Sequence, residues 1–198
     1  MIPDEPGGLV RLFDNNGNDS GAGVSSQNFE AQYDAFDDLA ADDFRVPAGH
    51  VWSVRRVIVS GVHYQGPGPA DSENVHFYTS KKKLPNALEK QFLGVVGSDS
   101  GGSFNIRLPS SVRLSGGPSD GAGKVYWLSV QATQDFSSAG QWLWEGALND
   151  AGDADAWENP GDGFGTGCTS WADERACIGD FGQGPSKMFK LRGVDLVQ

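Results

Sequence analysis

Short runs of β-branched and aromatic residues, separated by clusters of Gly, Pro, Asp and Ser, recur along almost the whole chain. The 198 residues include 28 glycines and 10 prolines. β-branched and aromatic residues favour strands, whereas Gly, Pro, Asp and Ser favour the turns between them. The pattern predicts an all-β protein: a two-sheet antiparallel β-sandwich of jelly-roll-like character, formed as a single domain by residues 1–198.

Nine runs have the character of strands. They cover residues 8–13, 42–46, 51–64, 74–79, 90–96, 103–108, 124–132, 141–148 and 187–197. Both alternating faces of the run 51–64 are mixed, so we expect a bulge that shifts its register, or an arginine that faces a partner. Residues 28–41 could form a turn or two of helix. Residues 149–185 lack alternation and are predicted to form a long ordered loop rich in Gly, Asp and Trp.

The charge balance restricts the partners. A formal net charge of -11 repels nucleic acid and anionic lipid, and leaves neutral glycans or cations as more plausible partners. No stretch approaches the roughly 18 apolar residues of a spanning helix, so we expect no membrane insertion. The first residues do not resemble a signal peptide, so secretion would require a signal outside this sequence. The basic run 81–83 is expected to be a solvated hairpin loop.

Cys168 and Cys177 are the two cysteines of the chain. A zinc site would need further Cys or His residues nearby, whereas two cysteines in an acidic β-protein more often form a disulfide. We therefore expect a Cys168–Cys177 bridge and a secreted or cell-surface location.

Two acidic segments could bind calcium, because hard cations prefer carboxylate and amide oxygens. The first segment does not fit an EF-hand, since Asp19 and Ser25 stand where that loop needs Gly and Glu. The alternatives to calcium are side chains that cap their own turns, or an acidic surface rim. The candidate ligands are Asp14, Asn16, Asn18, Asp37, Asp38, Asp42 and Asp43.

Four segments carry a family resemblance: AADDFRVPAGHVWSVRRVIVSGV, NVHFYTSKKKLPNA, VYWLSVQATQDFSSAGQWLWE and AWENPGDGFGTGCTSW. From about Phe29 to its C-terminus, the chain resembles the β-sandwich, jelly-roll-like accessory modules of bacterial secreted hydrolases and surface proteins. The resemblance implies a non-catalytic, extracellular domain of a larger protein, with a binding or stabilising role.

Polysaccharide or cell-surface glycan is the expected ligand, because Trp rings stack on the apolar faces of sugars while polar neighbours bond the hydroxyls. Trp142 and Trp144 share one face of a strand, so both belong either to a surface platform or to the core. The candidate sugar-binding residues are Trp142, Trp144, Trp157, Trp171, Glu145, Asp155, Asn159 and Arg175.

Two other function classes stay open. One is a structural or adhesive domain of a larger surface protein or protease, without a ligand of its own. The other is a small glycoside hydrolase or lyase acting through Glu145, with Glu158 or Asp155 as a second carboxylate. The segment 98–102 is similar to the nucleophile motif of chymotrypsin-like proteases, but no histidine has the required setting, so we expect a turn.

Overall fold

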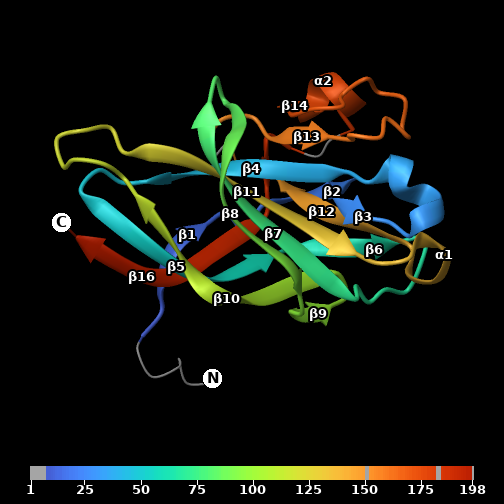
Figure 1. The fold of residues 1–198 in the computed structure, drawn as a ribbon, viewed down its shortest axis with the longest axis horizontal. Helices are drawn as coiled ribbons and strands as arrows, with labels where there is room; N and C mark the ends of the chain where they lie inside the picture. Colours follow the sequence, from blue (N-terminus) through green and yellow to red (C-terminus); the bar gives the residue numbers. More distant parts are fainter. Residues whose placement is uncertain (1–7, 150–151, 182–183, 198) are drawn as a thin grey trace.

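The structure, a computed structural model, describes residues 8–149, 152–181 and 184–197. Strands dominate it and pair almost throughout in antiparallel fashion, which confirms the predicted all-β sandwich (Figure 1). A third, smaller sheet accompanies the two large ones. The chain crosses repeatedly between sheets, as expected of a jelly-roll-like arrangement.

One large sheet has the order β1-β16-β5-β10-β9. Its strands are β1 (Val10–Asp14), β16 (Phe189–Val197), β5 (His50–Val59), β10 (Ser103–Ser115) and β9 (Ser98–Ser100). The other large sheet has the order β14-β13-β4-β11-β7-β8, with β3 parallel to β11. Its strands are β14 (Ala172–Asp173), β13 (Ala156–Glu158), β4 (Leu39–Val46), β11 (Lys124–Thr133), β7 (Ser72–Lys81), β8 (Leu84–Val95) and β3 (Gln27–Asn28).

The third sheet places β12 between β15 and β2, and β6 also pairs with β12. Its strands are β15 (Ser186–Lys187), β12 (Gln141–Ala147), β2 (Asp19–Ser25) and β6 (Gly61–Tyr64). The described residues also form three short helices: the 3-10 helix η1 (Ala31–Phe36), α1 (Phe136–Ala139) and α2 (Glu174–Ile178). The predicted helical segment 28–41 therefore contains η1, and β4 begins before the segment ends.

A bulge at Arg55 explains the mixed faces of the run 51–64. In the pairing of β5 with β16, Val54 lies opposite Gly193 and Arg56 opposite Arg192, so Arg55 is the extra residue. Val54 is buried before the bulge and Val57 after it, because the extra residue reverses which positions face the core. The predicted bulge is confirmed, but the run is not one strand: it divides into β5 and β6, which belong to different sheets.

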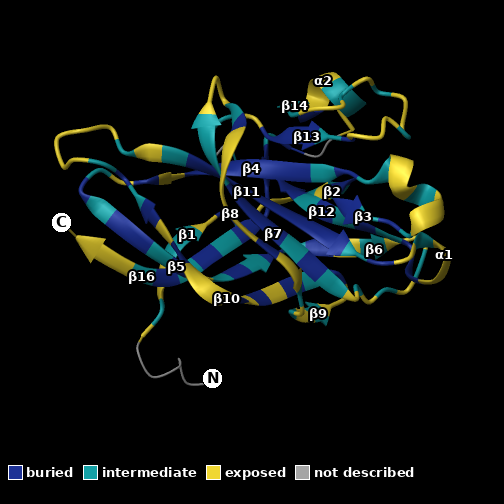
Figure 2. Ribbon diagram, in the orientation of Figure 1, coloured by how far each residue is buried: buried dark blue, intermediate teal, exposed yellow. Residues whose placement is uncertain are grey.

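Aromatic side chains fill the space between the sheets. Trp142 and Trp144 are both 0% exposed. The Trp142 indole nitrogen donates to the carbonyl of Gly102 at 2.7 Å, and that of Trp144 donates to the carbonyl of Met188 at 3.0 Å. Both rings therefore belong to the core, and the alternative of a surface platform on β12, with Trp142 and Trp144 as sugar-binding residues, is wrong. Figure 2 shows β12 largely buried, in contrast to the exposed η1.

The basic run 81–83 joins β7 to β8 in a tight hairpin, as expected. Lys82 and Lys83 are exposed and adopt positive φ angles of 54° and 63°. The ammonium of Lys83 lies 3.0 Å from the Asp153 carboxylate.

Candidate ligand groove

Aromatic rings from distant parts of the sequence meet at one end of the molecule. η1 and α1 lie together there, beside the loop that follows β13 (Figure 1). These elements surround an open, mainly apolar hollow of about 200 Å³, which we call the aromatic pocket. It is lined by Phe29, Tyr33, Phe36, Gln65, Phe136, Gln141 and Phe164.

The rings of the aromatic pocket pack edge against face. Tyr33 meets Phe136 with ring centroids 5.9 Å apart and Phe36 at 6.2 Å, and Phe36 meets Phe164 at 5.1 Å. Edge-to-face contacts of this kind fix ring orientation. Phe164 nevertheless keeps 41% of its surface exposed, and Tyr33, Phe36 and Phe136 are half-buried. The pocket thus presents fixed aromatic surface to solvent.

Glu30 holds α1 against η1. Its carboxylate accepts hydrogen bonds from the backbone nitrogens of Phe136 at 2.6 Å and Ser137 at 3.1 Å, and from the Ser137 hydroxyl. Although burial acts to raise it, hydrogen bonds from Ser137 and Phe136 lower the pKa of Glu30 to about 2. The ionised carboxylate therefore persists down to acidic pH, and the position of Phe136 is maintained with it.

The segment predicted as one long loop, residues 149–185, also contains β13, β14 and α2, and Asn159 joins it to η1. Its side-chain nitrogen donates to the carbonyls of Ala35 and Asp37, both at 2.8 Å, and its side-chain oxygen accepts from the backbone nitrogen of Phe164 at 3.1 Å. Gly163 approaches so closely that an added Cβ would lie 2.5 Å from the Ala35 oxygen. Asn159 is fully buried, so its predicted role as a sugar ligand is corrected to one of positioning Phe164.

A second hollow of about 450 Å³ adjoins the aromatic pocket, since Gln141 and Phe164 line both. Phe181, which is 74% exposed, stands at its edge. Its lining comprises Gly23, Val24, Ser25, Asp38, Gln141, Leu143, Trp157, Phe164, Thr166, Cys177, Ile178 and Phe181. The two hollows together form what we call the ligand groove.

A chain of polar side chains lies beneath the groove. Gln141 donates to the Ser25 hydroxyl at 2.8 Å, which donates to Asp38 Oδ1 at 3.1 Å, and the Gln27 backbone nitrogen donates to the same oxygen at 2.7 Å. Asp38 Oδ2 is buried and has no hydrogen-bond partner in the part of the chain described. Burial raises the pKa of Asp38 to about 8, against the opposing effect of these hydrogen bonds. At neutral pH this carboxyl is therefore largely uncharged.

The predicted tryptophans of the long loop have separate positions. Trp157 is 2% exposed, donates from its indole nitrogen to the Ser25 carbonyl at 3.1 Å, and packs against Phe164, so it forms the base of the groove. Trp171 packs edge-on against Tyr78 with ring centroids 5.7 Å apart. Trp171 does not line either hollow, so the structure does not bring the two tryptophans into one site.

The predicted polar ligands are also dispersed. Glu145 is half-buried on β12, and burial, with Asp19 nearby, raises its pKa. Arg175 is exposed on α2. Asp155 is buried in an ion pair with Lys187, so it is not available to a sugar hydroxyl. None of the three lines the groove.

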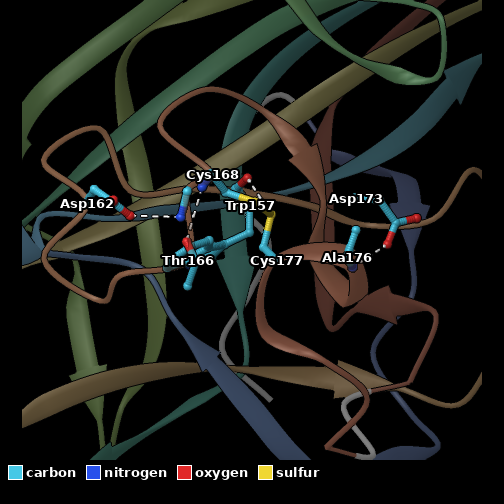
Figure 3. Close-up of a disulfide and its surroundings, with 8 residues drawn as sticks. Trp157, Asp162, Thr166, Cys168, Asp173, Ala176 and Cys177 are labelled. Atoms are coloured by element: carbon cyan, nitrogen blue, oxygen red, sulfur yellow. Dashed lines mark hydrogen bonds between the residues drawn. A yellow bond between two sulfur atoms is a disulfide. The ribbon is translucent and has the colours of Figure 1, made fainter.

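The predicted disulfide is confirmed, with Cys168 and Cys177 joined across a Cα–Cα distance of 5.8 Å. Figure 3 shows the bridge beside Trp157, whose carbonyl oxygen lies 3.9 Å from Cys177 Sγ. The loop before the bridge is held by Asp162, whose carboxylate accepts from the Gly167 backbone nitrogen at 2.8 Å. The bridge thus fixes one side of the groove.

The candidate calcium ligands mostly bond to backbone. Asp37 accepts from the nitrogen of Phe29 at 2.7 Å, Asp42 from that of Lys187 at 2.7 Å, and Asp43 from that of Asp153 at 2.8 Å. In the first segment, Asp14 accepts from the nitrogen of Asn16 at 3.1 Å, which is the capped turn that the sequence also allowed. No group of three or more His, Cys, Asp or Glu residues able to hold a metal occurs in residues 8–149, 152–181 and 184–197. Calcium binding stays a prediction without a built site.

The protease-like segment is only partly the expected turn: residues 98–100 form β9, which pairs with β10, and the turn follows at residues 101–102. Asp99 accepts from the backbone nitrogen of Gly102 at 2.7 Å through Oδ1, and its Oδ2 lies 2.8 Å from His63 Nε2. For the hydrolase alternative, Glu145 and Glu158 lie on β12 and β13, which belong to different sheets.

The aromatic pocket was missed from the sequence, although one local signal was present. Tyr33 and Phe36 are three residues apart in the only segment predicted to form helix, and this spacing brings side chains to one face. Phe136 and Phe164 come from far along the chain, and no local pattern indicates that they meet.

No family model matches the sequence, and no curated protein matches it. Among solved structures, the chain is similar to the cysteine protease and lectin-like domains of Cwp84, a surface layer associated protein of Clostridium difficile, with a TM-score of 0.45 and 12% sequence identity. The match covers 81% of this chain and 32% of that chain, so the chain spans about a third of the structure it resembles. In the described residues, no helix is long and apolar enough to cross a membrane.

Proposed function

We propose that the chain is a non-catalytic carbohydrate-binding domain, which binds a neutral polysaccharide or cell-surface glycan in the ligand groove. The observation that supports this most directly is a set of partly exposed rings, held in fixed orientation around an open hollow: Tyr33, Phe36, Phe136 and Phe164. An aromatic face stacks on the apolar face of a pyranose.

The polar lining of the groove supports the same ligand class. Gln65 and Gln141 carry amides, which can both donate to and accept from sugar hydroxyls. Among the residues whose positions the structure gives, no ionised group lines the aromatic pocket, and Asp38 beneath the second hollow is largely uncharged at neutral pH. A neutral, hydroxyl-rich ligand fits this lining better than a charged one.

We further propose that the domain works outside the cytoplasm, as an accessory part of a larger secreted or surface-attached bacterial protein. Support comes from the Cys168–Cys177 disulfide, because such bonds persist in oxidising compartments. The net charge of -11 also suits a domain that keeps clear of nucleic acid and anionic membranes.

The test is affinity electrophoresis of the whole chain on a panel of soluble polysaccharides, together with pull-down on insoluble ones. We expect retardation on at least one glycan, and Tyr33→Ala or Phe136→Ala to weaken binding about tenfold each, equivalent to about 1.4 kcal/mol. Trp171→Ala is the matched control, because it removes a half-buried ring outside the groove and should leave affinity unchanged.

Two results would replace the proposal. Unretarded migration on every glycan would favour the structural or adhesive alternative. Release of reducing sugar from the same panel, lost in Glu145→Gln, would establish the hydrolase instead. Circular dichroism of each variant separates lost binding from lost folding.

A further inference from the structure

One lysine and two carboxylic acids lie together in the protein interior, away from the ligand groove. The ammonium nitrogen of Lys187 lies 2.7 Å from Asp155 Oδ2 and 2.7 Å from Glu174 Oε1. The side chains are 0%, 2% and 1% exposed, respectively. Burial of ionised groups at this depth is costly even when they are paired.

Backbone contacts fix the position of all three residues. Lys187 belongs to β15, which pairs with β12, and its backbone nitrogen donates to Asp42 Oδ2 at 2.7 Å. Asp155 directly precedes β13, and its carbonyl accepts from the backbone nitrogen of Glu174, the first residue of α2, at 3.1 Å. The three reactive groups are therefore held by separate elements and have little freedom to move apart.

The charges in this cluster do not balance. Lys187 faces Asp155 and Glu174, and Glu174 Oε2 is buried without a hydrogen-bond partner among the described residues. Burial raises the pKa of Glu174 to about 7, although Lys187 opposes the change. Burial by itself lowers the pKa of Lys187, but the two carboxylates raise it overall. Before any reaction, Lys187 is therefore an ammonium, and Glu174 can take up or release a proton near neutral pH.

We propose that Lys187 and Asp155 condense into an intramolecular amide bond, with Glu174 as the proton carrier. Lys187 Nζ first gives one proton to the Glu174 carboxylate, because an ammonium has no lone pair with which to attack. The neutral amine then attacks Asp155 Cγ, an Nζ–Cγ bond forms, and a Cγ–Oδ bond breaks. Glu174 passes the two protons that leave the nitrogen to the departing oxygen, which leaves as water. Charge balances, because an ammonium and a carboxylate become a neutral amide and one water, and no oxidant or cofactor is required.

Two physical effects favour this reaction in the folded protein. Well-oriented intramolecular groups reach effective concentrations of up to roughly 10⁵–10⁸ M, and holding the amine and the acid together in this way offsets the unfavourable condensation of free amines and acids in water. The amide also replaces a buried ion pair by a neutral group, and so removes much of the desolvation cost. Neither effect operates in the unfolded chain, so the bond would form only after folding.

The bond would close the long loop covalently. Asp155 lies near its start and Lys187 just after its end, and the Cys168–Cys177 disulfide lies between them. The amide would thus hold the base of the loop in a way that reducing agents cannot reverse.

The test is the intact mass of the full chain after denaturation and reduction. We expect a mass lower than that of the sequence by one water, and a branched proteolytic peptide that joins the Asp155 and Lys187 segments. Glu174→Gln should retain the full mass while keeping its fold by circular dichroism. Lys190→Met, which removes a lysine that pairs with Asp14 at 3.1 Å, is the control and should still lose the water.

Three outcomes would overturn the proposal. A folded wild-type protein with the full sequence mass would show that the cluster is only an ion-pair network. A dehydrated but unbranched peptide would indicate a succinimide, for which Asp162-Gly163 is a candidate. A branched peptide that joins Lys187 to Glu174 would show that Glu174, and not Asp155, forms the amide. Peptide mapping of the wild-type chain decides the question even if a variant fails to fold.

Discussion

Replacement of Asp38 by Asn should change how the stability of the protein depends on pH. Asn retains the oxygen that accepts from the Gln27 backbone nitrogen and the Ser25 hydroxyl, at 2.7 Å and 3.1 Å in the wild type. It replaces the second, buried oxygen by an amide nitrogen that cannot ionise. The shape of the site is nearly unchanged, so the substitution chiefly removes one titration.

The magnitude follows from the pKa of Asp38, which burial raises from the usual 3.8 to about 8. Between these pH values the native carboxyl keeps a proton that the unfolded chain releases. The contribution of Asp38 to the free energy of unfolding is therefore complete below about pH 4. It falls by about 1.4 kcal/mol for each pH unit up to about pH 8. Over the whole window the loss amounts to ~6 kcal/mol, and Asp38→Asn should be free of it.

Urea denaturation of both proteins between pH 4 and pH 8.5 measures this difference. Glu73, Glu158 and Glu174, whose pKa values burial raises to about 7, affect both proteins alike, so the difference between the two curves isolates Asp38. Asp71→Asn, at an exposed position, controls for the loss of one acidic side chain. Parallel curves for wild type and Asp38→Asn would refute the reasoning.

Three further variants test the fold. Trp142→Ala should lower the free energy of unfolding by about 3–5 kcal/mol, because a fully buried ring stacked on Phe104 leaves a cavity, and a loss below about 1 kcal/mol by urea denaturation would contradict its core position. Asn159→Ala should cost about 2–3 kcal/mol in the same assay, because three hydrogen bonds to backbone groups are lost, and an unchanged midpoint would argue against that role. Combined Lys82→Asn and Lys83→Gly should raise stability by about 0.5–1 kcal/mol, because both positions have positive φ, and a lower melting temperature would contradict the turn geometry.

Much of the sandwich could be predicted because its signals are local. The alternation of apolar and polar residues identified β11 and β12 to within one residue at each end. The mixed faces of the run 51–64 indicated the bulge at Arg55. Strand β2 was missed, because its sequence DSGAGVS has small and polar residues and becomes a strand only through pairing with β12. Tertiary pairing, rather than intrinsic preference, decides such segments.

The candidate site was harder to predict, because burial decides which residues of a suitable type can meet a ligand. Trp142 and Asn159 have the right chemistry for a sugar, but both are buried and bonded within the protein. Phe136 is held at the surface by a hydrogen bond from its backbone nitrogen to Glu30, which lies more than a hundred positions away in the sequence. Contacts at such separation leave no trace in local patterns.

The two ends of the long loop meet on neighbouring strands, since Ala147 of β12 pairs with Ser186 of β15. The chain therefore leaves and re-enters the third sheet at the same register position, whatever lies between. Because β13 pairs with β4 and Trp157 is buried, that part of the segment is fixed, and only its exposed stretches can change in length while the strands on either side keep their pairing. Natural variation or grafting in these exposed stretches could therefore change the binding preference without disturbing the third sheet.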